Sequence, residues 1–184
     1  YVQFFNSKRP LKTPEDFKGL TIRAYSAGDA ETLKALGAAP TIISSAEMYM
    51  ALQRGTIDGA DTGMPAAISR KVVEVQKYMT LANYAVAEFL VQANLKWWNG
   101  LTPEQQNAIT KAAADAEAYI REKVATAEAD AQATIAKAGI AIHVPSEEEL
   151  AAFIQATTPV RETYLKNSGE LGAKLLPIAD KARR

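Results

Sequence analysis

The sequence has no cysteine and only one histidine, His143, among its 184 residues. Without thiols, the chain forms no disulfide and offers no thiolate for metal binding or nucleophilic attack. A single histidine between Ile142 and Val144 supplies neither a common zinc cluster nor a Ser-His triad, and a histidine beside apolar residues is usually structural. The P-loop, the dinucleotide fingerprint and the nucleophile elbow are also missing. We therefore expect a protein that is not an enzyme and that uses no metal or cofactor.

Neither sign of charge is in excess, because Lys plus Arg and Asp plus Glu both number 21. A balanced charge gives no electrostatic reason to expect nucleic acid or an anionic membrane as a partner. No apolar run approaches the roughly 18 residues of a membrane-spanning helix, so we expect a chain that is not embedded in a membrane. The sequence opens at Tyr1 with neither an initiator Met nor a signal-peptide pattern, which indicates a mature, processed or truncated chain.

Start and stop signals divide the chain into short elements. Capping patterns begin helices at Thr13, Ser44, Thr102 and Ser146, and glycines end helical patterns at positions 19, 37, 55 and 139. The predicted strands are 21–25, 41–43, 56–60, 78–82, 87–95 and 140–144. The predicted helices are 29–36, 46–54, 65–76, 103–138, 147–156 and a tail, 169–184, broken at Pro177. Strand, helix, strand at these lengths implies an α/β fold with parallel pairing through right-handed crossovers.

Two candidate ligand-binding segments follow strands of this predicted sheet. Ligands of open α/β sheets sit beyond the carboxyl ends of the strands, and residues 23–26 and 61–64 lie at two such ends. Arg23 is the strongest candidate, because a guanidinium group matches a carboxylate bidentately and stays charged. The alternative for Arg23 is a surface ion pair.

The other candidates each have a structural alternative. Asp61, Thr62 and Met64 either line the pocket or form an ordinary strand-to-helix loop, in which Asp61 or Thr62 caps the next helix. Tyr84 either stacks on a ligand and hydrogen-bonds it, or is a core or interlobe tyrosine. The pair at positions 97 and 98 is a tempting stacking platform, but adjacent side chains point to different sides, so we favour packing in the core.

Five segments in register resemble the solute-binding proteins of TRAP transporters, the DctP-like family. They are the run 10–23, Leu36 to Ala38 with Pro40 after it, the helix end 47–55, the strand 57–59 and the helix start 101–106. The resemblance covers nearly the whole chain. It implies that Arg23 holds a substrate carboxylate and that Tyr84 lies close to the ligand. This chain has Thr62 where many members have Asn or Trp, and Gln3 where some have a second arginine.

The resemblance also implies how the chain is organised. We expect the carboxyl-terminal portion of a longer protein: a periplasmic-binding-protein-like lobe with a mixed sheet, from residues 1–88 and 129–184. Residues 89–128 would form an interlobe strand, the long helix and part of a largely missing first lobe. Apolar side chains should then lack cover at Phe89, Val91, Trp97, Trp98 and Ile109.

The implied function is capture of a small organic anion in an interlobe cleft. The implied location is the periplasm, and the implied partners are the TRAP membrane permease subunits. One alternative is a fragment of an α/β enzyme acting on a carboxylic acid. Another is an interaction protein built on the Ala-rich helix, although that helix lacks the sustained heptads of a coiled coil.

Overall fold

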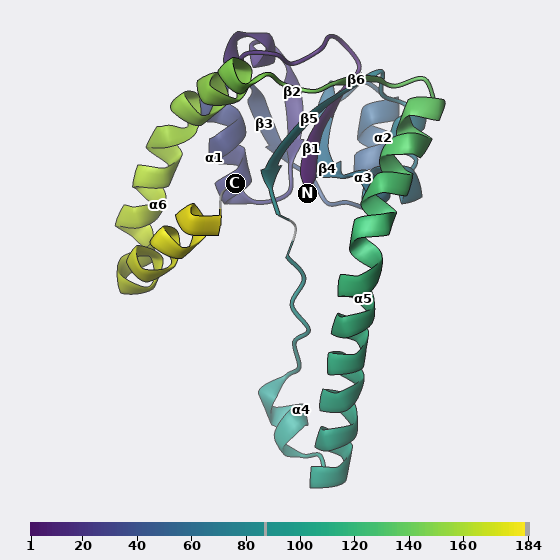
Figure 1. Ribbon diagram of the computed structural model, residues 1–184, viewed down its shortest axis with the longest axis vertical. Coiled ribbons are helices and arrows are strands. Elements are labelled where there is room, and N and C mark those ends of the chain that lie inside the picture. The colour runs from purple at the N-terminus through teal and green to yellow at the C-terminus, as the bar shows by residue number, and fades with distance from the viewer. Residues whose placement is uncertain (87, 183–184) are drawn as a thin grey trace.

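The computed structural model describes residues 1–86 and 88–182, without the side chains of residues 125 and 182. Six strands form one sheet in the order β3-β2-β4-β1-β5-β6 (Figure 1). Their bounds are β1 Val2–Asn6, β2 Thr21–Ala24, β3 Ala39–Ile42, β4 Gly59–Gly63, β5 Tyr78–Ala85 and β6 Ala141–His143. The helical elements are η1 Pro14–Phe17, α1 Ala27–Ala35, α2 Met48–Gln53, α3 Met64–Ser69, η2 Val72–Glu74, α4 Leu95–Asn99, α5 Pro103–Lys137 and α6 Glu147–Ala182.

The sheet is mixed because β1 runs against its neighbours. β2 is parallel to β3 and β4, and β5 is parallel to β6, whereas β1 is antiparallel to both β4 and β5. The other five strands therefore point the same way, and their carboxyl ends share one edge of the sheet. Residues 88–94 and the free end of α5 extend away from that edge (Figure 1). The predicted α/β lobe with a mixed sheet is confirmed.

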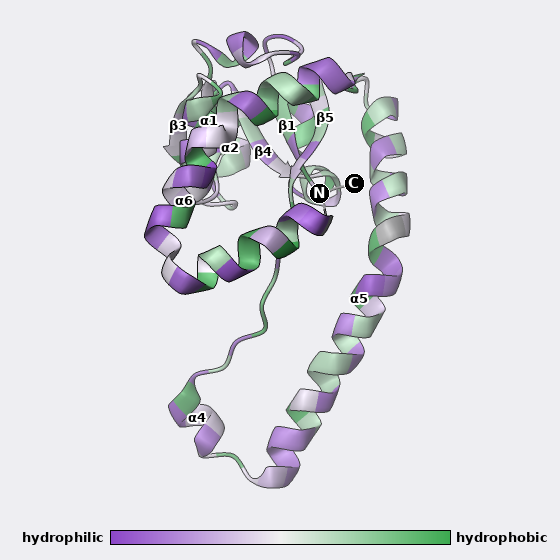
Figure 2. Cartoon of the chain, turned by 60° about the vertical axis from the view of Figure 1, so that its left-hand side comes forward, coloured by the Kyte–Doolittle hydropathy of each residue, from purple (hydrophilic) through white to green (hydrophobic). Residues whose placement is uncertain are grey.

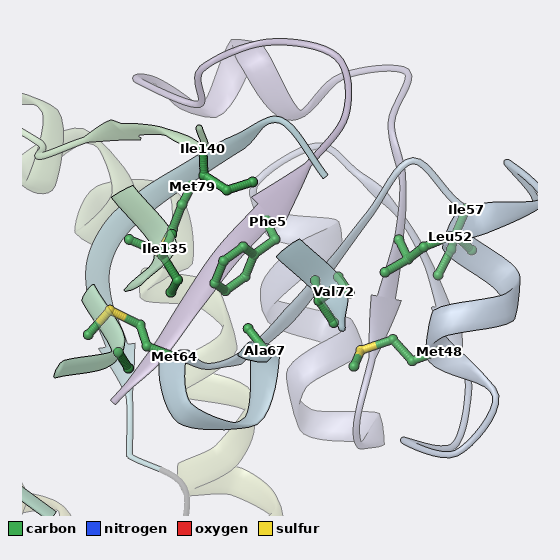
Figure 3. Close-up of a cluster of buried hydrophobic side chains, with 12 residues drawn as sticks. Phe5, Met48, Leu52, Ile57, Met64, Ala67, Val72, Met79, Ile135 and Ile140 are labelled. Carbon is green, nitrogen blue, oxygen red and sulfur yellow. The ribbon is translucent and has the colours of Figure 1, made fainter. Parts of the chain in front are cut away.

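Helices cover both faces of the sheet because neighbouring side chains of β1 point to opposite faces. Phe5 is buried in one cluster, with side chains from α2, α3 and α5 (Figure 3). Phe4 is buried in the other cluster, with side chains from α1 and with Phe153 from α6. Both phenylalanines are almost fully buried, which makes β1 the centre of the fold.

β1 and β4 are the strands that the sequence patterns described least well. β1 was not predicted, because all five of its side chains are buried and it shows no polar alternation. The predicted strand 56–60 lies three residues too early, since β4 extends to Gly63. Asp61 and Thr62 therefore lie in a strand and not in a loop, and Gly63 rather than either of them precedes α3.

The prediction of a strand over residues 87–95 is wrong for the residues that the structure describes. Residues 88–94 have no regular structure and α4 begins at Leu95, while residue 87 lies outside the described residues. The tail also differs, because Pro177 lies inside α6 and the chain turns instead at Gly169, where φ is 58°. Glycine adopts that left-handed conformation without steric cost.

Apolar side chains are exposed to solvent along the segment from residue 88 to the part of α5 that does not contact the sheet. Phe89 is 91% exposed, Val91 85%, Trp97 53% and Ile109 36%, whereas Trp98 is half-buried. This lack of cover was predicted for all five residues and is observed for four of them. The core packing expected for the pair is wrong for Trp97, whereas Trp98 lies between the two expectations. Hydrophilic and hydrophobic residues alternate along α5 (Figure 2). Among the described residues, no helix is at once long and apolar enough to cross a membrane.

Candidate functional site

Arg23 lies near the carboxyl end of β2 and is 5% exposed. The backbone pairing of β2 with β4 stops at Arg23 and Ala60, one residue before Asp61. The side chain of Arg23 continues the link between the two strands, because its Nη1 donates to Asp61 O at 3.0 Å. Its Nε donates to Ile43 O at 2.9 Å and its Nη2 donates to Ser45 Oγ at 3.2 Å. The guanidinium group thus joins β4 to the segment that follows β3.

These contacts leave part of the guanidinium group uncommitted. Arginine has five N–H donors, of which the hydrogen bonds among the described residues use three. One N–H on each terminal nitrogen, Nη1 and Nη2, is not used by these three hydrogen bonds. A carboxylate that binds arginine bidentately accepts hydrogen bonds from two N–H groups on different nitrogens. Arg23 is therefore held rigidly by the backbone and still has the donors that an anion needs.

Asp61 faces Arg23 from β4 and is fully buried. Its Oδ1 atom lies 3.5 Å from Arg23 Nη1, longer than the roughly 2.7–2.9 Å of a charge-assisted hydrogen bond. Oδ1 has no hydrogen-bond partner among the described residues. Burial, followed by the neighbouring Asp29, raises the pKa of Asp61 to about 8. The Arg23–Asp61 contact is therefore loose, although both groups are buried.

Tyr84 connects Asp61 to a second acid. Its hydroxyl group lies 2.8 Å from Asp29 Oδ1 and is also hydrogen-bonded to Asp61 Oδ2. Burial and then the two nearby carboxyl groups raise the pKa of Tyr84. The ring of Tyr84 stacks on Phe4. Tyr84 is thus a packing residue through its ring and a site residue through its hydroxyl group.

Asp29 belongs to the cluster and was missed as a site residue. It lies in the first turn of α1, where its backbone N–H donates to Ser26 Oγ at 3.2 Å. Its Oδ2 accepts the N–H of Tyr25 at 3.1 Å. The pattern Ser26-Ala-Gly-Asp29 is a helix-start signal, so a cap could have been predicted there. The proximity of Asp29 to Asp61 could not have been predicted, because only the packing of α1 against the sheet brings the two side chains together.

Thr62 and Met64 are not joined to this cluster by the described contacts. Side chains alternate along a strand, so Thr62 points away from the face of Asp61, and it pairs in register with Gln3. Met64 is 4% exposed and packs in the hydrophobic cluster of Phe5 (Figure 3). Of the five predicted site residues, the structure brings together Arg23, Asp61 and Tyr84.

A separate hollow of about 610 Å³ lies at the α4 end of the molecule, away from the carboxyl edge of the sheet (Figure 1). It is lined by Asn94, Lys96, Trp97, Gly100, Leu101 and Gln105. The hollow is open, and none of these lining side chains is buried. The buried charged groups lie instead around Arg23, so we take the Arg23 cluster as the candidate site.

Comparison with protein families identifies the family of the chain. Residues 1–167 match the DctP model, described as bacterial extracellular solute-binding protein, family 7. The chain belongs to this family. Its members are binding proteins, so the family assignment places the chain among binding proteins and not among enzymes. The interpretation as a fragment of an α/β enzyme is therefore not supported.

Individual proteins of this family are similar to the chain over most of its length. The chain is 33% identical to the 2,3-diketo-L-gulonate-binding periplasmic protein YiaO of Escherichia coli, over 97% of this chain and 54% of that protein. It is 31% identical to the C4-dicarboxylate-binding periplasmic protein DctP of Rhodobacter capsulatus, over 91% of this chain and 51% of that protein. The chain thus spans about half the length of these curated relatives.

A solved structure confirms the fold. The chain superposes with a TM-score of 0.93 and 25% identity on the sugar acid binding protein DctPAm of Advenella mimigardefordensis in complex with galactonate. The match covers 99% of this chain and 59% of that protein. The structure therefore matches one large part of that sugar acid binding protein.

Proposed function

We propose that this chain is the Arg23-bearing part of a solute-binding protein that captures a small organic anion and delivers it to TRAP membrane permease subunits. The observation that carries the proposal is the buried Arg23 guanidinium group, anchored by three hydrogen bonds with one further N–H on each terminal nitrogen. A buried cation needs a compensating anion, and a ligand carboxylate fits both the charge and the geometry.

The ligands named for the relatives support a carboxylic acid. One relative is named for a C4-dicarboxylate, another for 2,3-diketo-L-gulonate, and the solved structure holds galactonate. All three are small organic anions at neutral pH. The first two relatives are both named as periplasmic proteins, and we propose the same location for this protein.

We further propose that residues 1–88 and 129–184 form one ligand-binding lobe and that residues 89–128 belong to the other lobe. The exposed apolar side chains of that segment support this division, because Phe89 and Val91 are more than four-fifths exposed. A second lobe would cover them and would close the site over Arg23. Hinge closure around a ligand is the standard motion of periplasmic binding proteins. Thr62 is proposed to line the closed site.

Calorimetry on the full-length protein tests the role of Arg23, with galactonate, succinate and 2,3-diketo-L-gulonate as probes. We expect at least one probe to bind, and Arg23→Ala and Arg23→Lys to weaken its binding by about 2–5 kcal/mol, roughly 30-fold to several thousand-fold. Arg54→Ala is the matched control, because Arg54 is exposed at the end of α2. Unchanged affinity in a folded Arg23→Ala variant would contradict the proposal.

A further inference from the structure

We propose that Asp61 is a neutral, protonated carboxyl group in the empty site, and that its ionisation gives Arg23 an internal counterion that excludes anionic ligands. The inference rests on the proposed function and concerns the regulation of the same site. It makes ligand affinity depend on the presence of one buried proton.

The first support is the number of protons around Tyr84. A tyrosine hydroxyl group carries one proton and donates it to one acceptor. Tyr84 OH has two carboxyl partners, Asp29 Oδ1 at 2.8 Å and Asp61 Oδ2. If Tyr84 donates to one of them, its oxygen must accept a proton from the other. One of the two carboxyl groups is therefore protonated.

The second support identifies which carboxyl group that is. Asp29 accepts the backbone N–H of Tyr25 at 3.1 Å, and hydrogen bonding of this kind favours the ionised form. Asp61 is fully buried, and its Oδ1 atom has no hydrogen-bond partner in the described part of the chain. Burial disfavours the charged form of a carboxyl group. Asp61 thus holds the proton, and Asp29 accepts from Tyr84.

The third support is the spacing to Arg23. An ionised Asp61 would draw the guanidinium group into a charge-assisted hydrogen bond of about 2.7–2.9 Å. The observed distance from Arg23 Nη1 to Asp61 Oδ1 is 3.5 Å, while the same nitrogen bonds the Asp61 carbonyl at 3.0 Å. Arg23 is therefore anchored by neutral oxygen atoms, and its charge is left for a ligand.

The surroundings of Asp61 define its titration. Among the described residues, the charged and titratable groups that face it are Arg23 from β2, Asp29 from α1, Tyr84 from β5 and Tyr25 after β2. The residue opposite Asp61 in β1 is Phe4, which is apolar. Burial and Asp29 raise the pKa of Asp61 to about 8, and they outweigh the hydrogen bond with Tyr84 and the charge of Arg23, which both lower it. The proton is therefore present at neutral pH and lost in mildly alkaline solution.

The consequence is a ligand affinity that falls as the solution becomes alkaline. When Asp61 loses its proton to solvent, its carboxylate pairs with Arg23 and repels the ligand carboxylate. Binding then requires that one proton be taken up again by Asp61. For a single linked proton, the dissociation constant rises about tenfold per pH unit above the midpoint and is constant below it.

Calorimetry with galactonate on the full-length protein, between about pH 6 and about pH 9, measures this linkage. Galactonate stays ionised over the whole range, so its own charge does not change. We expect constant affinity at the acid end and a roughly tenfold loss per pH unit at the alkaline end. Asp61→Asn cannot ionise, so the affinity of this variant should lose the pH dependence seen in the wild type.

A second variant separates titration from packing. Asp29→Asn removes the negative charge that raises the pKa of Asp61, so the midpoint of the affinity loss should move to lower pH. A merely structural role of Asp29 would weaken binding equally at every pH. Wild-type affinity that is constant across the range, or a folded Asp61→Asn variant that keeps the wild-type pH dependence, would overturn the inference while leaving the proposed function in place.

A ligand-independent measurement keeps the inference testable if no acid binds. Infrared spectroscopy of the empty protein at neutral pH should show the carbonyl band of a protonated carboxyl group, and Asp61→Asn should lack it. If that band is present and neither galactonate, succinate nor 2,3-diketo-L-gulonate binds, the proposed function fails and the protonation of Asp61 stands. Absence of the band in the wild type overturns the inference.

Discussion

Tyr84 stacks flat on Phe4, with ring centroids 4.2 Å apart and an angle of 10° between the ring planes. The stack places the hydroxyl group of Tyr84 between the carboxyl groups of Asp29 and Asp61. This arrangement depends on an irregularity in the pairing of β5 with β1. The pairing of β1 with β5 shifts between Val2 and Phe4, and Asn83 adopts φ 48° in the extra stretch.

Tyr84→Phe tests the hydroxyl group separately from the ring. The ring stack is retained, so we expect a native fold with a free energy of unfolding reduced by about 1–3 kcal/mol, the cost of leaving buried polar groups without a partner. Chemical denaturation measures the change. The exposed Tyr164→Phe variant is the control and should differ from wild type by less than about 0.5 kcal/mol. Equal stability of both variants would contradict a buried Tyr84 hydrogen-bond network.

Gln3 is expected to hold the irregular part of β5. Its Nε2 donates to Asn83 Oδ1 at 2.6 Å, its Oε1 accepts the N–H of Asn83 at 2.9 Å, and the side chain is fully buried. Gln3→Ala should therefore lower the free energy of unfolding by about 1–3 kcal/mol. The exposed Gln53→Ala variant should change it by no more than about 0.5 kcal/mol. Thermal unfolding of the two variants side by side decides the matter.

Asp61→Asn should change how stability depends on pH. The folded state holds the proton of Asp61 up to about pH 8, whereas an unfolded chain releases it near about 3.9. Between these values the folded state binds more protons, so stability falls as the pH rises, by at most about 1.4 kcal/mol per pH unit. The Asp61→Asn variant should not show this loss of stability, because asparagine does not titrate. Denaturation at about pH 5 and about pH 8 should show its stability relative to wild type increasing with pH. A constant difference would mean that Asp61 does not titrate in this window.

Gly59 is expected to tolerate no side chain. A Cβ atom built there would lie 2.4 Å from Phe5 O, because β1 and β4 approach closely at the start of β4. Gly59→Ala should force the two strands apart and lower stability by about 1–3 kcal/mol, as overpacking does. Gly28→Ala is the matched control, since nothing lies within 4 Å of its Cβ position in α1. That variant should be neutral or slightly stabilised, because alanine favours helix. Unfolding midpoints compare the pair.

The isolated polypeptide 1–184 is expected to self-associate. Phe89, Leu90, Val91 and Trp97 are all at least half exposed along one segment, and large apolar patches drive association. Light scattering at increasing concentration measures this. Replacing Phe89 and Val91 with serine should reduce the association, whereas replacing the exposed Val144, which lies on the lobe before α6, should not. A monomer at all concentrations would count against the assignment of residues 89–128 to a second lobe.

Local chemistry in the sequence determined much of the secondary structure. The capping box at Thr102 and Gln105 begins α5, and the stop at Gly139 follows its end, within a residue of the prediction. Arg23 was singled out as a candidate because it follows an apolar run near the carboxyl end of a predicted strand, where open sheets bind ligands, and the structure places it near the end of β2. Signals of this kind act over a few residues, so a single sequence is enough to recognise them.

Only the tertiary structure decided how these elements meet. β1 lies between β4 and β5, which depends on pairing with strands far along the chain. The described contacts place Met64 in the core and bring Asp29, which no pattern singled out, to Asp61 through Tyr84. The charge state of Asp61 also follows from the structure, because burial and neighbouring carboxyl groups set it, and neither is visible in the order of the residues.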